Sequence, residues 1–253
     1  MYVARVLLNG ILIVGEIAAC AGIAWAALHH PWLFAGVTAG AAFAVGAGLE
    51  IARLRNEVRF YFGRETLSAG GLFLPVVGLM EALFKGLLAA VAAILTFAGT
   101  DHSRLFFIAI AFGVTIYAGV AMLRALSIGL GASPARWGFF RLGAPLGLLF
   151  SALIAVMAAY QVIPPTSVGQ IGWSIVWDMP KIPTVEQVSE LLFQIKQAFD
   201  GFVVTILSTV MAERWARIVA VLISVNVLAG FVAAFYASLI AGVVNAVERP
   251  AEK

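Results

Sequence analysis

The chain has 253 residues, of which 62% are hydrophobic and 11% are charged, and its mean hydropathy is +1.02. Soluble domains average about 45–50% apolar and about 25% charged residues, so this composition excludes a soluble protein and predicts an integral membrane protein. The net charge of +3 comes from scattered Arg and Lys residues, without a tract of five or more clustered cations, so nucleic acid is not an expected partner.

Hydrophobic runs follow one another along the chain with short connections between them. A bilayer core of about 30 Å requires about 20 helical residues. Six runs meet this length, at residues 6–28, 33–52, 72–98, 105–123, 144–163 and 218–244. The first is longer than the core of a signal peptide, so we expect it to be retained as a span. The sequence therefore predicts an all-α, polytopic transmembrane helical bundle that forms a single integral membrane domain over residues 1–253.

A shorter run at residues 199–212 decides between seven spans and six. It carries Asp200 near its start, and its length fits a short span, a re-entrant piece or an interfacial helix. Loop charges favour a cytoplasmic N-terminus, because cytoplasmic loops are enriched in Lys and Arg. With seven spans the C-terminus lies outside. A six-span arrangement moves the last basic pairs, Arg214 with Arg217 and Arg249 with Lys253, to the other side of the membrane. It leaves the three most basic loops inside. We expect the plasma (inner) membrane in either case.

The segment before this run has the pattern of an amphipathic helix at the outer interface. Thr184 follows Pro183 and precedes Gln187 by three residues, which is the pattern of a capping box at a helix start. Apolar residues then recur at alternating spacings of three and four, which predicts a helix with one apolar face. This apolar stripe comprises Val185, Val188, Leu192, Ile195, Phe199, Phe202 and Ile206. The helix either dives into the membrane as a tilted seventh span or lies at the interface, where its stripe contacts the bilayer or a partner.

The connection at residues 164–183 is the longest that we expect outside the membrane. Proline residues border it, and it contains Trp173 and Trp177. Two interpretations stay open for these tryptophans. They fit an aromatic belt at the headgroup level, and they also fit a lid or docking loop, because long connections in compact bundles are often functional.

Small residues recur at every fourth position in several of the runs. Such ladders allow helix backbones to approach closely and gain dispersion contacts that lipid cannot match. We therefore predict helix packing, within the chain or against a partner, at Gly36, Gly40, Gly48, Gly78, Gly86, Gly143, Gly147, Gly230 and Gly242.

Three charged residues within the apolar runs are the main candidates for a functional site. Glu16 lies near the middle of the first run, Lys85 lies near the middle of the third, and Glu81 precedes Lys85 by one helical turn. Both runs are expected to cross the membrane in the same direction, so Glu16 and Lys85 fall at similar depth. We predict that these two side chains face one another, with Glu81 as the local partner of Lys85.

This charge cluster has two interpretations. It can fix the helices in register, because removing one member of a buried ion pair strands the other at a cost of roughly 3–5 kcal/mol. It can also be a proton or ion relay in which one carboxylate titrates, as intramembrane acids in transporters do. With two acids and one base, one carboxylate needs a proton, water or a partner outside the chain.

Catalytic signatures are absent from the sequence. Glycine loops of the Walker and Rossmann types, a Gly-x-Ser-x-Gly elbow and a His-Glu-x-x-His motif are all missing, so we expect neither an enzyme nor a cofactor. His29, His30 and His102 map to connections on one side of the membrane and are only a weak candidate for a metal site, because proximity of loops does not ensure ligand geometry. We expect no resident metal.

Two functions remain. The first is a noncatalytic integral membrane subunit of a larger assembly, such as a translocation, secretion or energy-transducing complex, with other membrane subunits or further copies of the chain as partners. Its basis is the small-residue ladders, the one-sided stripe and the missing catalytic chemistry. The alternative is a self-sufficient proton- or ion-coupled transporter or channel for a small solute that uses the Glu16, Glu81 and Lys85 cluster.

Overall fold

The computed structural model describes residues 2–62, 73–99, 101–131, 133–139, 141–163, 183–212, 215–216, 219–220 and 223–251. This described part is helical and contains no β-strand. Its elements are α1 (Tyr2–His29), α2 (Pro31–Phe62), α3 (Phe73–Thr96), α4 (His102–Leu130), α5 (Pro134–Gly138), α6 (Gly143–Ala159), α8 (Val185–Ser208), the 3-10 turn η1 (Val225–Leu228) and α10 (Ala229–Ala251). The predicted all-α class is confirmed.

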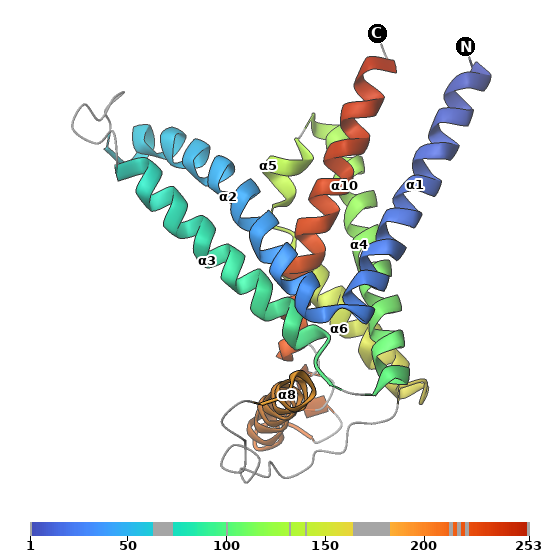
Figure 1. The fold of residues 1–253 in the computed structure, drawn as a ribbon, viewed down its shortest axis with the longest axis vertical. Helices are drawn as coiled ribbons and strands as arrows, with labels where there is room; N and C mark the ends of the chain where they lie inside the picture. Colours follow the sequence, from blue (N-terminus) through green and yellow to red (C-terminus); the bar gives the residue numbers. More distant parts are fainter. Residues whose placement is uncertain are drawn as a thin grey trace.

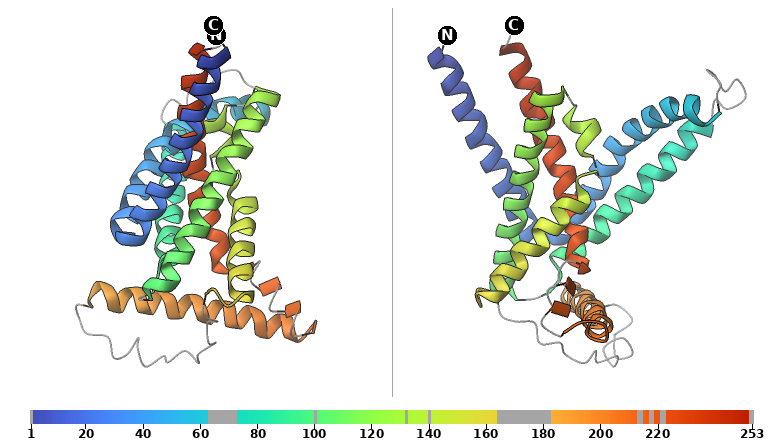
Figure 2. Two further views of the ribbon diagram at one scale, coloured as in Figure 1. Left: turned by 90° about the vertical axis from the view of Figure 1, so that its right-hand side faces the viewer. Right: turned by 180° about the vertical axis from the view of Figure 1, so that it is seen from behind.

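Within the described residues, six helices run lengthwise through the molecule: α1, α2, α3, α4, α6 and α10 (Figure 1). Both termini lie at the same end, which we call the terminal end. Helix α8 lies across the opposite end, nearly perpendicular to the others, and we call this the α8 end (Figure 2). An even number of lengthwise helices returns the chain to the end at which it starts.

The six lengthwise helices favour the six-span alternative over the seven-span arrangement. Length and composition alone make α8 a possible span and leave out α6, which has 17 residues. In space, α6 runs lengthwise and α8 lies across one end, so α6 is a further candidate span and α8 is a candidate by length and composition alone. Residues 199–212, the candidate seventh span, form the second half of α8 and the turn that follows it.

A row of side chains at spacings of four, three and four holds α8 across the end of the bundle. Ser189 Oγ accepts a hydrogen bond from the Gly99 amide at 3.0 Å, and Lys196 Nζ donates to the Leu95 carbonyl at 3.3 Å. Asp200 accepts bonds from Ser224 Oγ at 3.1 Å and from the Val225 amide at 3.4 Å. The Arg104 guanidinium lies 4.3 Å from the centre of the Phe193 ring. These contacts fix α8 to the ends of α3 and α4 and to η1.

The start of α8 is as the sequence predicts. The Gln187 amide donates to Thr184 Oγ1 at 3.3 Å, and the Thr184 amide donates to Gln187 Oε1 at 2.9 Å, so the capping box is confirmed. The apolar stripe lies on a different face from the row that docks on the bundle. Of its members, Val188 and Leu192 are half-buried and the remaining five are exposed, namely Val185, Ile195, Phe199, Phe202 and Ile206.

Helices α2 and α3 form a hairpin arm that leans away from the other lengthwise helices toward the terminal end (Figure 1). The arm joins them near the α8 end through an aromatic core. There the Phe34 ring lies edge to face with Phe97 and Phe112, at centroid distances of 6.1 and 6.2 Å, and stacks on Tyr236 at 5.5 Å. Tyr236 also shares a 2.7 Å hydrogen bond with Thr38. This junction ties α2, α3, α4 and α10 together.

Five of the ladder glycines lie where two helices nearly touch. A Cβ at Gly230 would lie 2.1 Å from the Gly143 carbonyl oxygen, and one at Gly147 would lie 2.2 Å from the Val227 carbonyl oxygen, so α10 and η1 cross α6 backbone to backbone. In the hairpin arm, a Cβ at Gly78 would lie 2.7 Å from Ile51 Cγ1. The equivalent atom at Gly86 would lie 3.0 Å from the Ala39 carbonyl oxygen.

The other four ladder glycines have open space around them. Gly36, Gly40 and Gly48 on α2 and Gly242 on α10 have nothing within 4 Å of an added Cβ. Ala44 completes the α2 set, and all four of its members are exposed. We call Gly36, Gly40, Ala44 and Gly48 the open α2 face. Of the predicted outer connection, residues 164–182 lie outside the described residues.

Candidate functional site: two charge networks in the membrane helices

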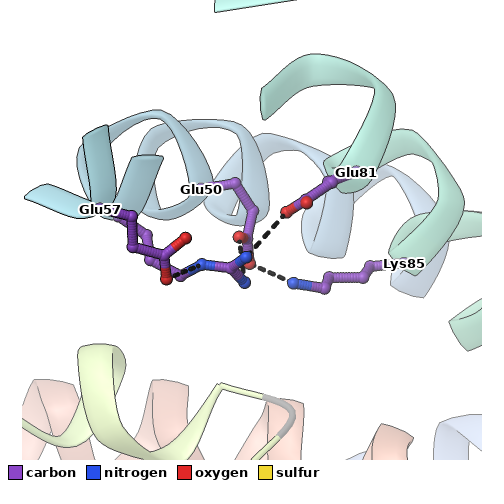
Figure 3. A network of polar contacts seen from close by, with 5 residues as sticks. Glu50, Glu57, Glu81 and Lys85 are labelled. Carbon is purple, nitrogen blue, oxygen red and sulfur yellow. Dashed lines mark hydrogen bonds and ion pairs between the residues drawn. The ribbon is translucent and has the colours of Figure 1, made fainter. Parts of the chain in front are cut away.

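The first charge network joins the two helices of the hairpin arm (Figure 3). Glu50, Arg53 and Glu57 follow one face of α2, and Glu81 and Lys85 follow one face of α3. Arg53 contacts all three carboxylates, at 2.9 Å to Glu50, 2.9 Å to Glu57 and 3.6 Å to Glu81, and Lys85 forms an ion pair with Glu50. We call these five residues the arm network. Among the described residues it contains one more acid than base.

The arm network borders a cavity of about 460 Å³ on the surface of the hairpin arm, lined by Arg53, Met80, Glu81, Phe84 and Lys85. The Glu50 side chain is 5% exposed, whereas the side chains of Glu81 and Arg53 are 35% and 42% exposed. The network therefore has a buried centre and a charged rim. Its rim lies within helices that are apolar enough to cross a membrane, where charge facing hydrocarbon is costly.

The second charge network joins α1, α4 and α10. Arg124 of α4 donates to Glu16 of α1 at 2.9 Å and forms an ion pair with Glu248 of α10. One turn further along α4, Ser127 Oγ donates to Asn245 Oδ1 at 3.3 Å. We call Glu16, Arg124 and Glu248 the bundle network. Because the Glu16 side chain is 3% exposed, its charge depends on Arg124 for compensation.

The predicted pairing of Glu16 with Lys85 is wrong. The two residues belong to separate networks, because α1 packs against α4 while α3 packs against α2. Similar depth in the membrane is not sufficient, since the hairpin arm leans away from α1. Lys85 pairs with Glu50 across the hairpin, and Glu81 contacts Arg53.

Sequence reasoning missed Glu50, Arg53, Arg124 and Glu248 as members of these networks. The predicted apolar runs end at residues 52 and 123, just before Arg53 and Arg124, so the sequence predicts that these two residues lie beyond the spans. The helices continue well past these residues, to Phe62 in α2 and to Leu130 in α4. The available signal was the spacing of three and then four between Glu50, Arg53 and Glu57, which extends one helical face beyond the apolar run.

A third polar cluster lies outside the lengthwise helices, where α8 docks. The Lys196 side chain is 3% exposed, and its burial, together with the nearby Arg104 charge, lowers the pKa of the ammonium group to about 8. Burial also raises the pKa of the Asp200 carboxyl group, an effect that its bond from Ser224 and the Lys196 charge oppose. The α8 contact therefore contains a lysine that can lose its proton a little above neutral pH.

The histidines are not gathered into a ligand set. His29 and His30 lie beside Trp25, at centroid distances of 4.5 and 6.3 Å, and His102 starts α4. In the described ranges, no group of three His, Cys, Asp or Glu side chains is close enough to hold a metal ion.

Comparison of the chain with protein-family models, with curated proteins and with solved structures finds no match. The class of the protein therefore follows from its own composition and geometry. It is a polytopic, all-α integral membrane protein, with lengthwise helices that contain two internally paired charge networks and an amphipathic helix across one end.

Proposed function

We propose that the chain is a noncatalytic integral membrane subunit of a larger membrane assembly, such as a translocation, secretion or energy-transducing complex. The observation that carries this proposal is the outward surface of the hairpin arm. The arm presents both the open α2 face and the charged rim of the arm network, at the depth of the spans. Small residues at every fourth position favour a second helix, and polar groups of a partner would neutralise the charged rim.

The apolar stripe of α8 supports the same proposal. Five of its seven members are exposed, including Phe199 and Phe202, although the helix is already fixed to the bundle by another face. Its apolar surface is thus free for a neighbouring subunit or for lipid at the α8 end. A one-sided apolar helix next to a helical bundle is a common contact between membrane subunits.

We further propose that the termini face the cytoplasm and that the membrane is the plasma (inner) membrane. With six spans and this orientation, ten basic residues, including Arg53 and Arg124 of the charge networks, lie in the cytoplasmic half of a span or beyond it. Five lie toward the outer side, and Lys85 lies near the middle of a span. This excess agrees with the enrichment of Lys and Arg in cytoplasmic loops.

Site-specific photocrosslinking tests the subunit proposal. A photoreactive amino acid is placed at Gly40 on the open α2 face or at Phe202 on the stripe, in cells that express the chain at its native level. Val14, an exposed residue of α1, and Glu186, an exposed residue on another face of α8, are the matched controls. We expect Gly40 and Phe202 to form adducts with one defined membrane protein, and the controls to give little. Equal adducts at all four positions, or adducts with lipid alone, would contradict the proposal.

A proton- or ion-coupled transporter remains the second candidate, and one observation favours it. Glu81 is a partly exposed carboxylate beside the 460 Å³ cavity, so water that enters the cavity can exchange its proton. The test is the purified chain alone in sealed vesicles with an imposed pH gradient. Dissipation of the gradient that Glu81→Gln abolishes would favour transport over the subunit role, whereas gradients equal to those of empty vesicles would exclude it.

A further inference from the structure

A groove between α1 and α4 belongs to neither charge network. Its volume is about 520 Å³, and it is open on one side. Its lining side chains are apolar apart from the Cys20 thiol, the Tyr117 hydroxyl and the indole N–H of Trp25. Small side chains such as Ala21, Ala24 and Ala109 leave the space, and larger ones such as Trp25 and Phe106 border it.

The groove has the length of one bilayer leaflet. On α1 its lining runs from Ile17 to Leu28, and on α4 from Phe106 to Tyr117. Eleven steps of helical rise give about 17 Å on each helix. Half of a bilayer core of about 30 Å is about 15 Å. The groove begins within one turn of the helix ends at the α8 end, so it extends from that interface to about the midplane.

The shape of the groove suits a hydrocarbon chain. It is an indentation along the seam where α1 and α4 pack against one another, so the two helices already occupy the positions from which a third helix would pack closely. A single hydrocarbon chain can follow such a seam along its length, and apolar chains fill apolar space that water leaves empty.

Groups suited to a lipid headgroup lie at the α8 end of the groove. Trp25 borders the groove near the end of α1, at the level where tryptophan contacts headgroups in membrane proteins. His29 lies one turn beyond Trp25, and His102 lies one turn before Phe106, and both are exposed. His29 Nδ1 donates to the Trp25 carbonyl at 3.0 Å, and in the imidazolium form Nε2 can also donate, to a phosphate.

We propose that this groove is a binding site for one acyl chain of a phospholipid in the leaflet at the α8 end, with the headgroup beside His29 and His102. The site is independent of the subunit proposal, because it needs only the chain and a bilayer. It retains one lipid at a fixed place, while lipid at the other exposed apolar surfaces exchanges freely.

Photoactivatable phospholipid tests this site on the full chain. The purified protein is placed in vesicles of phosphatidylethanolamine and phosphatidylglycerol that contain a little phosphatidylcholine with a diazirine on one acyl chain. After irradiation, the crosslinked residues are mapped by mass spectrometry. The comparison residues are Leu87 and Val91 of α3, which are exposed and lie at a similar depth from the α8 end.

We expect the yield per residue to be about tenfold higher in the groove than on α3, which corresponds to about 1.4 kcal/mol of preference. Ala21→Leu places three more carbons in the groove and should remove this excess. Ala18→Leu makes the same change at an exposed α1 residue outside the groove lining and should preserve it. Both variants change exposed positions, and unchanged thermal unfolding shows that both fold.

Two results would overturn the proposal. Equal yields on the groove and on α3 would show only freely exchanging lipid. Crosslinks on α3 but none in the groove would show that lipid does not enter it. Neither result bears on the Gly40 and Phe202 crosslinks, so this site and the subunit role fail separately.

Discussion

The crossing of α6 and α10 gives the sharpest prediction of stability. Gly230→Ala adds one methyl group whose carbon would lie 2.1 Å from the backbone oxygen of Gly143 and 2.1 Å from the backbone nitrogen of Gly147. Backbone atoms cannot rotate away as a flexible side chain can, so the two helices must separate. Gly242→Ala makes the same change three turns later on α10, where nothing lies within 4 Å of the new atom.

The expected magnitudes follow from two opposing effects. Overpacking costs typically about 1–3 kcal/mol, and we take the upper end because the neighbours are backbone atoms. Alanine is favoured over glycine within a helix by about 1 kcal/mol. Gly230→Ala should therefore lower the free energy of unfolding by about 2 kcal/mol, and Gly242→Ala should raise it by up to about 1 kcal/mol. At about 2–4 °C per kcal/mol for a chain of this size, Gly230→Ala lowers Tm by about 4–8 °C.

Cys20 provides the assay. It is the one cysteine of the chain, and it is 3% exposed, so a thiol-reactive fluorescent dye reports unfolding as the protein is heated in detergent. A Tm for Gly230→Ala that equals or exceeds the Tm for Gly242→Ala would refute the close crossing of α6 and α10.

The remaining predictions concern the charge networks, the α8 contact and the topology. Arg124→Gln leaves two carboxylates without their cation and should lower the free energy of unfolding by about 3–5 kcal/mol. Lys85→Gln should lower it by less, because the partner carboxylate, Glu50, keeps its ion pair with Arg53. Equal losses of Tm in the two variants would contradict this ranking. The Lys196 pKa of about 8 in the folded protein lies below the usual lysine value of about 10.4. Between these two values the unfolded chain binds a proton that the folded protein does not. The free energy of unfolding should therefore rise between about pH 8 and pH 10. Lys196→Met should remove that rise, and an identical pH dependence in the two proteins would show that the lysine does not titrate there. The topology can be tested in sealed vesicles with a membrane-impermeant thiol reagent. The reagent should label the cysteine of Thr205→Cys from one side of the membrane and cysteines added at the two termini from the other. Labelling of all three cysteines from the same side would exclude six spans.

The helical class and the start of α8 could be predicted from the sequence because both depend on local signals. Apolar runs and the capping box of Thr184 and Gln187 involve residues near one another in the chain. The span count could not be predicted, because loop charges are divided ten to five with either six or seven spans. What favours six spans is the polar row on α8, including Lys196 and Asp200, which holds this helix across the ends of α3 and η1.

The charge pairs could not be predicted, because depth along a helix does not determine which neighbour it faces. Glu16 and Lys85 share a depth, but the partner of Glu16 is Arg124, more than 100 residues away in sequence. The same limit applies to the glycine ladders. Gly230 is in close contact and Gly242 has open space, although both belong to one ladder on α10. Only the placement of the neighbouring helices distinguishes them.

The mass of the particle that contains the chain in its native membrane tests the subunit role most directly. The tagged chain, at native expression, is extracted into nanodiscs without detergent exchange, and the particle is analysed by native mass spectrometry. We predict that the particle contains the 26.8 kDa chain in a fixed ratio with at least one other membrane protein. Particles that contain the chain alone, or only whole multiples of 26.8 kDa, would contradict it.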